Sequence, residues 1–310
     1  MNLYKLIKSL KKNKIVPIIP ERELIWKGCD TEKYHWWPMR ETSENADDPT
    51  NNLFAKSGGL GKYDKLFETQ SVKFQKNNYF REFNSTAKDA GWSGFCDLAT
   101  ILSCLYQYPR YSVKVKYNGN EIEFSPRDIE ALMIVSCNNA IKRGKSIFLG
   151  ERNNGCELDD VNEPYPTDLI SSLKIICGDN IPFAMDIESK SAVWNYSYDK
   201  VIVIKHIRKP LRLNLSGVNI PKTGKTEYIQ FNLTSIAYPK KKQILWGWVN
   251  YTASIKSEGW ISKQHPDFIW KRYKKNSEWI GKSCINPEIN TNIVYKIYEK
   301  SIKKGGVVNI

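Results

Sequence analysis

The hydrophobic patterns along this chain place helices before strands. Two segments, 97–107 and 126–138, carry apolar residues at helical spacing. From residue 181 onward the chain instead holds segments dense in β-branched and aromatic residues, namely 192–195, 201–207, 228–236 and 245–253. Helices followed by strands are typical of the α+β class, so we expect a helical layer packed on a mostly antiparallel sheet.

The helix at 126–138 has a clear start signal. Ser125 stands before Pro126, and Asp128 falls in the first turn. A serine hydroxyl caps free backbone N–H groups, and proline is tolerated at the first helical position because its missing N–H would be unpaired there. The sequence therefore predicts that this helix begins at Pro126.

The domain organisation follows from the absence of a composition break, low-complexity linker or internal repeat in the 310 residues. We expect one domain, at 17–284, with a terminal extension on each side. Residues 1–16 carry leucines and an isoleucine at helical spacing among lysines, which predicts a basic amphipathic helix. That helix would suit docking on the body, a membrane surface or a partner protein. Residues 285–310 would form a basic C-terminal extension, with a helix at 294–304.

The net charge limits the classes of partner that the chain would bind. Against 33 Asp+Glu the chain carries 47 Lys+Arg, a net charge of +14, which would suit nucleic acids, anionic membranes or acidic proteins. The lysines are dispersed and no nucleic-acid-binding signature accompanies them, so the sequence favours a solvated basic surface over a nucleic-acid site.

Targeting signals are also missing from the sequence. No apolar stretch approaches the roughly 18 to 20 residues of a membrane-spanning helix, which argues against a transmembrane protein. The basic N-terminus lacks the apolar core and cleavage site of a secretory signal. We expect a cytoplasmic location, or delivery by a specialised secretion route.

Cysteine and histidine usage gives no sign of a metal site. The seven cysteines are thinly spread, without C-x-x-C spacing, which predicts mostly free thiols in a reducing compartment. The three histidines, His35, His206 and His265, do not fall at metal-ligand spacing. We expect neither a metal nor a cofactor.

The most informative local string is Gly91–Asp97, a glycine-containing loop that runs straight into the helix expected at 97–107. Cys96 therefore stands at a helix N-terminus, where unpaired N–H groups and the helix dipole favour an anion. This position predicts a lowered thiol pKa and a thiolate that attacks carbonyl carbon. The same N–H groups can hold an oxyanion. A buried structural thiol is the alternative interpretation.

Together with other segments, this string resembles the transglutaminase elicitor family of oomycete and bacterial proteins, within the papain-like thiol acyltransferases. The similar segments cover roughly residues 26–270 in family order: 34–38, 62–64, 91–97, 148–152, 156–162, 183–186, 193–195, 258–260 and 265–270. The resemblance implies a transglutaminase-like (papain-like) fold. It also implies a chemistry that joins a protein glutamine to an amine through a cysteine thioester.

The resemblance further implies roles for three residues. Cys96 matches the nucleophile, and Asp186 matches the aspartate that orients the catalytic histidine. Trp92, in the loop before Cys96, would support the oxyanion. Without the resemblance, Asp186 would be interpreted as a strand-end residue bonded to backbone.

The histidine that the family places between these two residues is missing. No histidine occurs between Cys96 and Asp186, and the expected position falls near Leu169 or Ile170. A hydrocarbon side chain cannot accept a proton, and loss of the base from such a triad costs several orders of magnitude in rate.

Two features would rescue catalysis. His206, on the strand expected at 201–207, would act as the base if that strand lies near Cys96. Otherwise a low thiol pKa at the helix start would support slow chemistry. We expect structural roles for the other histidines, with His265 beside Trp270 and His35 packed among neighbouring tryptophans.

Three functions stay open at this point. The first is cysteine-dependent acyl transfer or deamidation at protein glutamine. The second is a catalytically degenerate protein of the same fold, acting as a partner-binding module or secreted effector. The third, a basic protein associated with membrane or nucleic acid, would be recognised by salt-dependent binding. After Asn195 the chain departs from the family's elicitor peptide, so plant immune recognition is not carried over, and the sequence leaves substrate and oligomeric state open.

Overall fold

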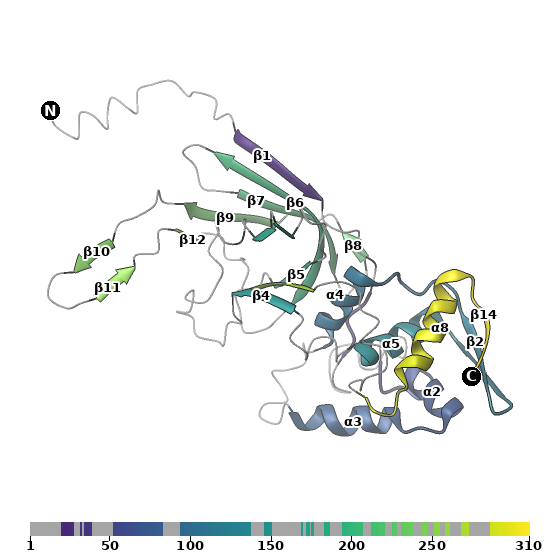
Figure 1. The fold of residues 1–310 in the computed structure, drawn as a ribbon. Coiled ribbons are helices and arrows are strands. Elements are labelled where there is room, and N and C mark those ends of the chain that lie inside the picture. The colour runs from purple at the N-terminus through teal and green to yellow at the C-terminus, as the bar shows by residue number, and fades with distance from the viewer. Residues whose placement is uncertain are drawn as a thin grey trace, which may run out of the picture.

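The structure is a computed structural model of the chain (Figure 1). It describes residues 20–27, 32, 34–38, 52–82, 94–137, 146–150, 169, 172–173, 175–176, 183–186, 194–206, 212–220, 225–227, 231–237, 243–246, 251–254, 258–260, 268–272 and 286–310. The predicted N-terminal helix at 1–16 and His265 lie outside these residues.

A nine-stranded sheet with antiparallel pairings forms one part of the described structure. Its main path is β12-β9-β7-β6-β5-β13-β4, with β1 paired to β6 and β8 to β7. The strands are β1 (Pro20–Lys27), β4 (Ser146–Gly150), β5 (Phe183–Asp186), β6 (Asn195–His206), β7 (Arg212–Ile220), β8 (Lys225–Glu227), β9 (Phe231–Ala237), β12 (Glu258–Trp260) and β13 (Phe268–Arg272).

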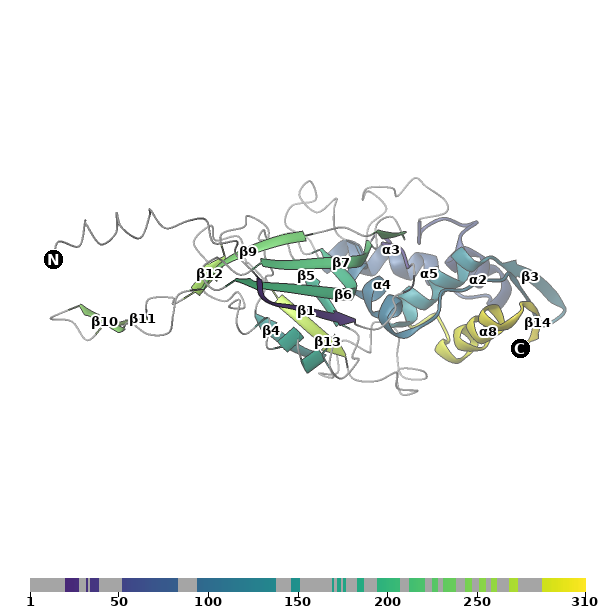
Figure 2. The ribbon, with the colours of Figure 1, turned by 90° about the horizontal axis from the view of Figure 1, so that it is seen from above.

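Helices cover one end of this sheet. They are α2 (Gly59–Phe67), α3 (Ser71–Glu82), α4 (Cys96–Leu105), α5 (Pro126–Cys137) and α8 (Thr291–Lys303). Helix α4 contacts β5 and β6 directly, whereas α5 lies behind it in contact with α2 and α8 (Figures 1 and 2). The arrangement confirms the α+β class and makes α4 the element that joins the helices to the sheet.

Both helices expected early in the chain are confirmed as α4 and α5. The start of α5 is a reciprocal cap. The Ser125 hydroxyl accepts a hydrogen bond from the Asp128 N–H at 3.2 Å, and the Asp128 carboxylate accepts one from the Ser125 N–H at 2.8 Å. Two N–H groups at the helix start are thereby paired.

The strand expectations are confirmed in type and corrected in detail. Asn195, the last residue of the expected segment 192–195, and residues 201–206 lie in one strand, since β6 runs unbroken from Asn195 to His206. The segment 245–253 is a hairpin of β10 (Gln243–Trp246) and β11 (Tyr251–Ser254), with Trp246 opposite Tyr251. The sequence between the two strands contains glycine and asparagine, which favour turns, and this explains why one apolar run became two short strands.

The helix expected at 294–304 is α8, but residues 286–310 are not an extension. Val294, Ile297 and Tyr298 are buried in the core, because they repeat on one face of the helix. Strand β14 (Gly306–Asn309) then pairs in parallel with β2 (Val113–Tyr117), which pairs with β3 (Asn120–Phe124). The C-terminus therefore completes the helical part of the fold.

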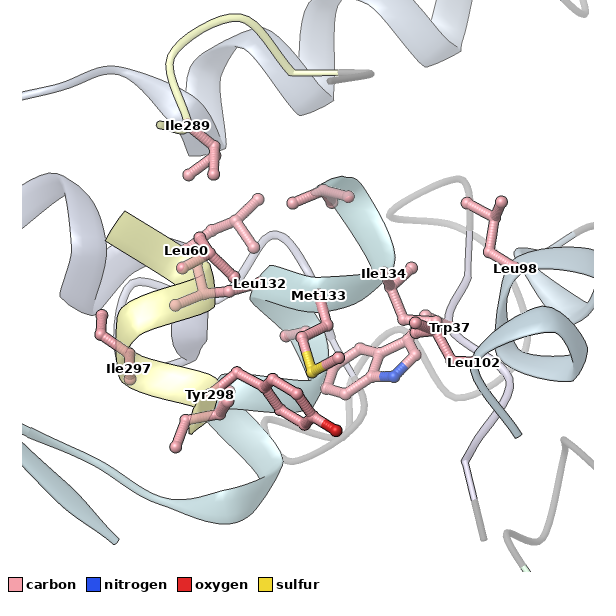
Figure 3. Packing of buried hydrophobic residues seen from close by; sticks show 14 of the residues in the cluster. Trp37, Leu60, Leu98, Leu102, Leu132, Met133, Ile134, Ile289, Ile297 and Tyr298 are labelled. Carbon is pink, nitrogen blue, oxygen red and sulfur yellow. The ribbon is translucent and has the colours of Figure 1, made fainter. Parts of the chain in front are cut away.

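The hydrophobic core lies among the helices (Figure 3). Side chains from α2, α4, α5 and α8 converge there with Trp37, which precedes all of them in sequence. Helix α5 is buried at every residue from Asp128 to Ser136. The core therefore fixes α4 and the 34–38 segment against α5.

No helix among the described residues has the length and apolar character to cross a membrane.

Candidate functional site

Cys96 is the first residue of α4 and sits where that helix meets the sheet. Its side chain is only 6% exposed. Phe95 is the N-cap residue and makes no side-chain capping bond, but its carbonyl accepts a hydrogen bond from Ala99 N–H at 3.0 Å. The helix start is thus formed by backbone, and it holds Cys96 against β5 and β6.

The pairing of β5 with β6 places two polar side chains opposite each other. Asp186 and Asn195 are direct partners in the antiparallel register, so both project from the same face of the sheet. Asp186 is fully buried, and its Oδ1 accepts a hydrogen bond from Trp194 N–H at 3.2 Å. Asn195 is 4% exposed, and its Nδ2 donates to the Cys96 Sγ at 3.6 Å.

Thr100 joins the helix to the strand one turn after the cysteine. Its buried hydroxyl donates to the Cys96 carbonyl at 2.7 Å and lies 3.1 Å from the Asn195 carbonyl. The position of Cys96 relative to Asn195 is therefore held by backbone and side-chain contacts together.

The segment 34–38 crosses the loop that leads into Cys96. Pro38 forms an isolated antiparallel bridge with Gly94, and Phe95 N–H donates to the Trp37 carbonyl at 2.8 Å. The Trp36 ring lies against Gly94 and 6.5 Å from the Trp194 ring. The indole N–H of Trp36 is buried and has no hydrogen-bond acceptor among the described residues. A buried donor therefore lies beside the loop that leads to Cys96.

The electrostatics of Cys96 overturn the lowered pKa expected from the helix start. Burial raises the pKa of the thiol to about 12, and the neighbouring Asp97 adds to the rise, while hydrogen bonds from Asn195 oppose it. Removal of the sulfur from water penalises the charged thiolate, and this is the largest cause of the shift. Burial also raises the pKa of Asp97, to about 6. In this conformation Cys96 is a neutral thiol.

The structure brings two of the predicted site residues together and separates a third. Cys96 and Asp186 meet at Asn195, whereas His206 lies at the opposite end of β6, paired with Pro20. At about 3.3 Å per residue, that 12-residue strand is on the order of 40 Å long. That length argues against His206 as the base of Cys96. Trp92 lies outside the described residues.

Of the two positions where the resemblance expects the catalytic histidine, the structure describes one. Leu169 is helical and fully buried, whereas Ile170 lies outside the described residues. That either residue packs beside Cys96 stays a prediction.

His35 does not pack in the way expected. Its Nδ1 lies 3.0 Å from a carboxylate oxygen of Glu130, and its backbone N–H donates to the same carboxylate. Glu130 is fully buried and also accepts from Arg127 at 2.6 Å and Tyr108 at 2.9 Å. His35 thus anchors the 34–38 segment to α5 through its contacts with the buried Glu130 carboxylate.

Asn195 is the residue that the sequence interpretation missed as a site residue. Its signal was its place in the segment 193–195 that resembles the family, nine residues beyond Asp186. Only the strand register turns that spacing into a contact. Among the described residues, no group of three metal-ligating side chains lies close enough to hold an ion.

Comparisons with known proteins bear on the fold. No protein-family model and no curated protein matches the chain. It is similar to a solved structure, the crystal structure of the GP42 transglutaminase from Phytophthora sojae, with a TM-score of 0.59 and 15% sequence identity. The similarity covers 89% of this chain and 91% of the other. The chain therefore has a transglutaminase-like fold, as the sequence resemblance implied.

Proposed function

We propose that this chain, with its transglutaminase-like fold, acts through Cys96 on the carboxamide of protein glutamine residues, by acyl transfer or deamidation. The supporting observation is the convergence of a cysteine at a helix start with Asn195 and Asp186 on the adjoining strands. The contact between Cys96 and the β5–β6 pair forms between segments roughly 90 residues apart in sequence.

The chemistry follows from the groups present. The Cys96 sulfur attacks the carboxamide carbon, a C–S bond forms, and the C–N bond breaks to release ammonia. An amine or water then cleaves the thioester. The α4 N-terminal N–H groups and the buried Trp36 indole N–H are donors for the oxyanion that develops during attack.

The rate of this reaction is limited by the protonation state of Cys96. With a thiol pKa of about 12, the thiolate is on the order of one part in 10,000 at pH 8. The departing ammonia also requires a proton, and the chain has no histidine between Cys96 and Asp186 to deliver it. We therefore expect turnover to be very slow.

A second function is favoured by the same neutral thiol. A protein that keeps the fold but has lost the base would use the site's surroundings to hold a protein partner, as a binding module or delivered effector. Trp194, which is partly exposed beside the buried Trp36, is an aromatic contact suited to that role.

The experiment measures incorporation of a fluorescent amine into a glutamine-bearing protein, with glutamine deamidation followed by mass spectrometry. We expect slow labelling by the wild type and none by Cys96→Ala. Cys104→Ala, the matched control on the same helix, retains the wild-type rate. Leu169→His and Ile170→His should raise turnover if Asp186 can orient the new ring. Failure of every variant to label or deamidate would reject the enzyme and favour the binding module.

A further inference from the structure

The amide of Asn195 contacts the atom on which negative charge must develop. Its Nδ2 donates to the Cys96 Sγ at 3.6 Å, within the range accepted for hydrogen bonds to sulfur. The charged groups that act on this sulfur include the carboxylates of Asp97 and Asp186, and both disfavour a thiolate. Hydrogen bonds from both the backbone and the side chain of Asn195 favour the thiolate, and of these two only the side-chain donor can be removed by substitution.

The amide is also held in place. The backbone of Asn195 is paired with Asp186 across the sheet, and its carbonyl lies 3.1 Å from the Thr100 hydroxyl. The side chain is 4% exposed, so it cannot exchange its contact with sulfur for contacts with bulk water. A buried donor fixed in this way requires no reorganisation when charge appears.

We infer that Asn195 is a catalytic residue of the Cys96 site, whose side-chain amide stabilises the thiolate through a hydrogen bond to Sγ. The inference rests on the proposed function for the reaction in which that thiolate is used. In the step concerned, the S–H bond breaks, the electron pair stays on sulfur, and the proton passes to a solvent hydroxide to give water. The amide keeps both its protons, so Asn195 stabilises the anion and shuttles nothing.

The size of the expected change in thiolate population depends on how well the thiol and the thiolate of Cys96 each accept a hydrogen bond. A neutral thiol is a weak acceptor, whereas a hydrogen bond to an ionised acceptor is roughly twice as strong as a neutral one. Loss of the donor should therefore lower the thiolate population by about tenfold or more at any pH below the thiol pKa. Reagents that react only with the thiolate should slow by the same factor.

The test is alkylation of the folded full chain by iodoacetamide at pH 8 and pH 10, with the Cys96 peptide followed by mass spectrometry. The variants are Asn195→Leu, which replaces the amide by a hydrocarbon of similar volume, and Asn195→Asp, which keeps the shape but replaces the donor. Ser103→Ala is the matched control, because it removes a buried hydrogen bond of 2.7 Å to Ala99 from the same helix without touching Cys96. Circular dichroism establishes that each variant is folded.

We expect Asn195→Leu to slow alkylation of Cys96 about tenfold or more, and Asn195→Asp to slow it further because a carboxylate repels the thiolate. Ser103→Ala should stay within about twofold of wild type. Looser packing alone would expose the sulfur and accelerate alkylation, so equal or faster reaction of either Asn195 variant overturns the inference. Amine incorporation is measured on the same samples. A slowed alkylation without turnover in any sample would reject the proposed function and leave the thiolate-stabilising role of Asn195 intact.

Discussion

The indole of Trp36 lies against Gly94 so closely that a Cβ at position 94 would overlap the ring. Trp36 also contacts Trp194, the residue before Asn195. One side chain therefore contacts both the loop that leads into Cys96 and the residue before Asn195.

Gly94→Ala should destabilise the fold by roughly 1 to 3 kcal/mol, because the added methyl displaces a buried tryptophan. Chemical denaturation followed by tryptophan fluorescence measures the change. Gly119→Asn is the control, since Gly119 has a positive φ of 78° that asparagine tolerates, and a Cβ at this position would meet no atom within 4 Å. An unchanged stability for Gly94→Ala would show that Trp36 does not occupy this position.

Glu130→Gln should destabilise the fold by roughly 2 to 3 kcal/mol. The carboxylate is buried and binds His35, Arg127 and Tyr108, so its neutralisation leaves the Arg127 guanidinium without an anion. Tyr108→Phe, which removes one donor, should cost about 1 kcal/mol. Equal and small losses for both variants, measured by urea unfolding, would contradict a central role for Glu130.

Asp97 should make the fold less stable as the pH rises through 4 to 6. Burial raises the pKa of its carboxyl from 3.8 to about 6, so the folded state binds more protons than the unfolded state in that window, and stability falls as they are released. Asp97→Asn should remove this fall and gain up to about 3 kcal/mol at pH 7. The free energy of unfolding of the wild type and of Asp97→Asn is measured in urea at pH 4 and pH 7. An equal change with pH in the two proteins would refute the prediction.

Cys96 itself should alkylate slowly at neutral pH, at a rate that rises about tenfold per pH unit with no plateau up to roughly pH 11. The cause is the thiol pKa of about 12, because only the thiolate reacts. Peptide mapping after timed iodoacetamide pulses provides the measurement. A plateau below pH 9 would mean that the site opens and that the helix start, rather than burial, governs the thiol.

Several features were readable from sequence because they depend on neighbouring residues alone. The apolar spacing in 97–107 and 126–138 predicted α4 and α5, and the Ser125–Asp128 pair predicted the start of α5. Local hydrogen bonds and helical periodicity decide such features before any distant contact forms. The order of helices and strands predicted the α+β class for the same reason.

The site was readable only in part. The sequence predicted that Cys96 begins a helix, and the resemblance pointed to Asp186. Neither could show that Asn195 contacts the sulfur, because that contact depends on the register of β5 and β6. A shift by one residue would have turned Asn195 to the other face of the sheet.

The sequence by itself determined the helices α4 and α5, the α+β order of the elements, and the start of a helix at Cys96. Only the tertiary structure decided that Cys96 is a neutral thiol, that His206 is a strand's length away from it, and that the C-terminal helix completes the core. The physical reason is that burial, strand register and distance are set by contacts between remote segments. Local periodicity carries no information about those contacts, and they govern the chemistry of the sulfur.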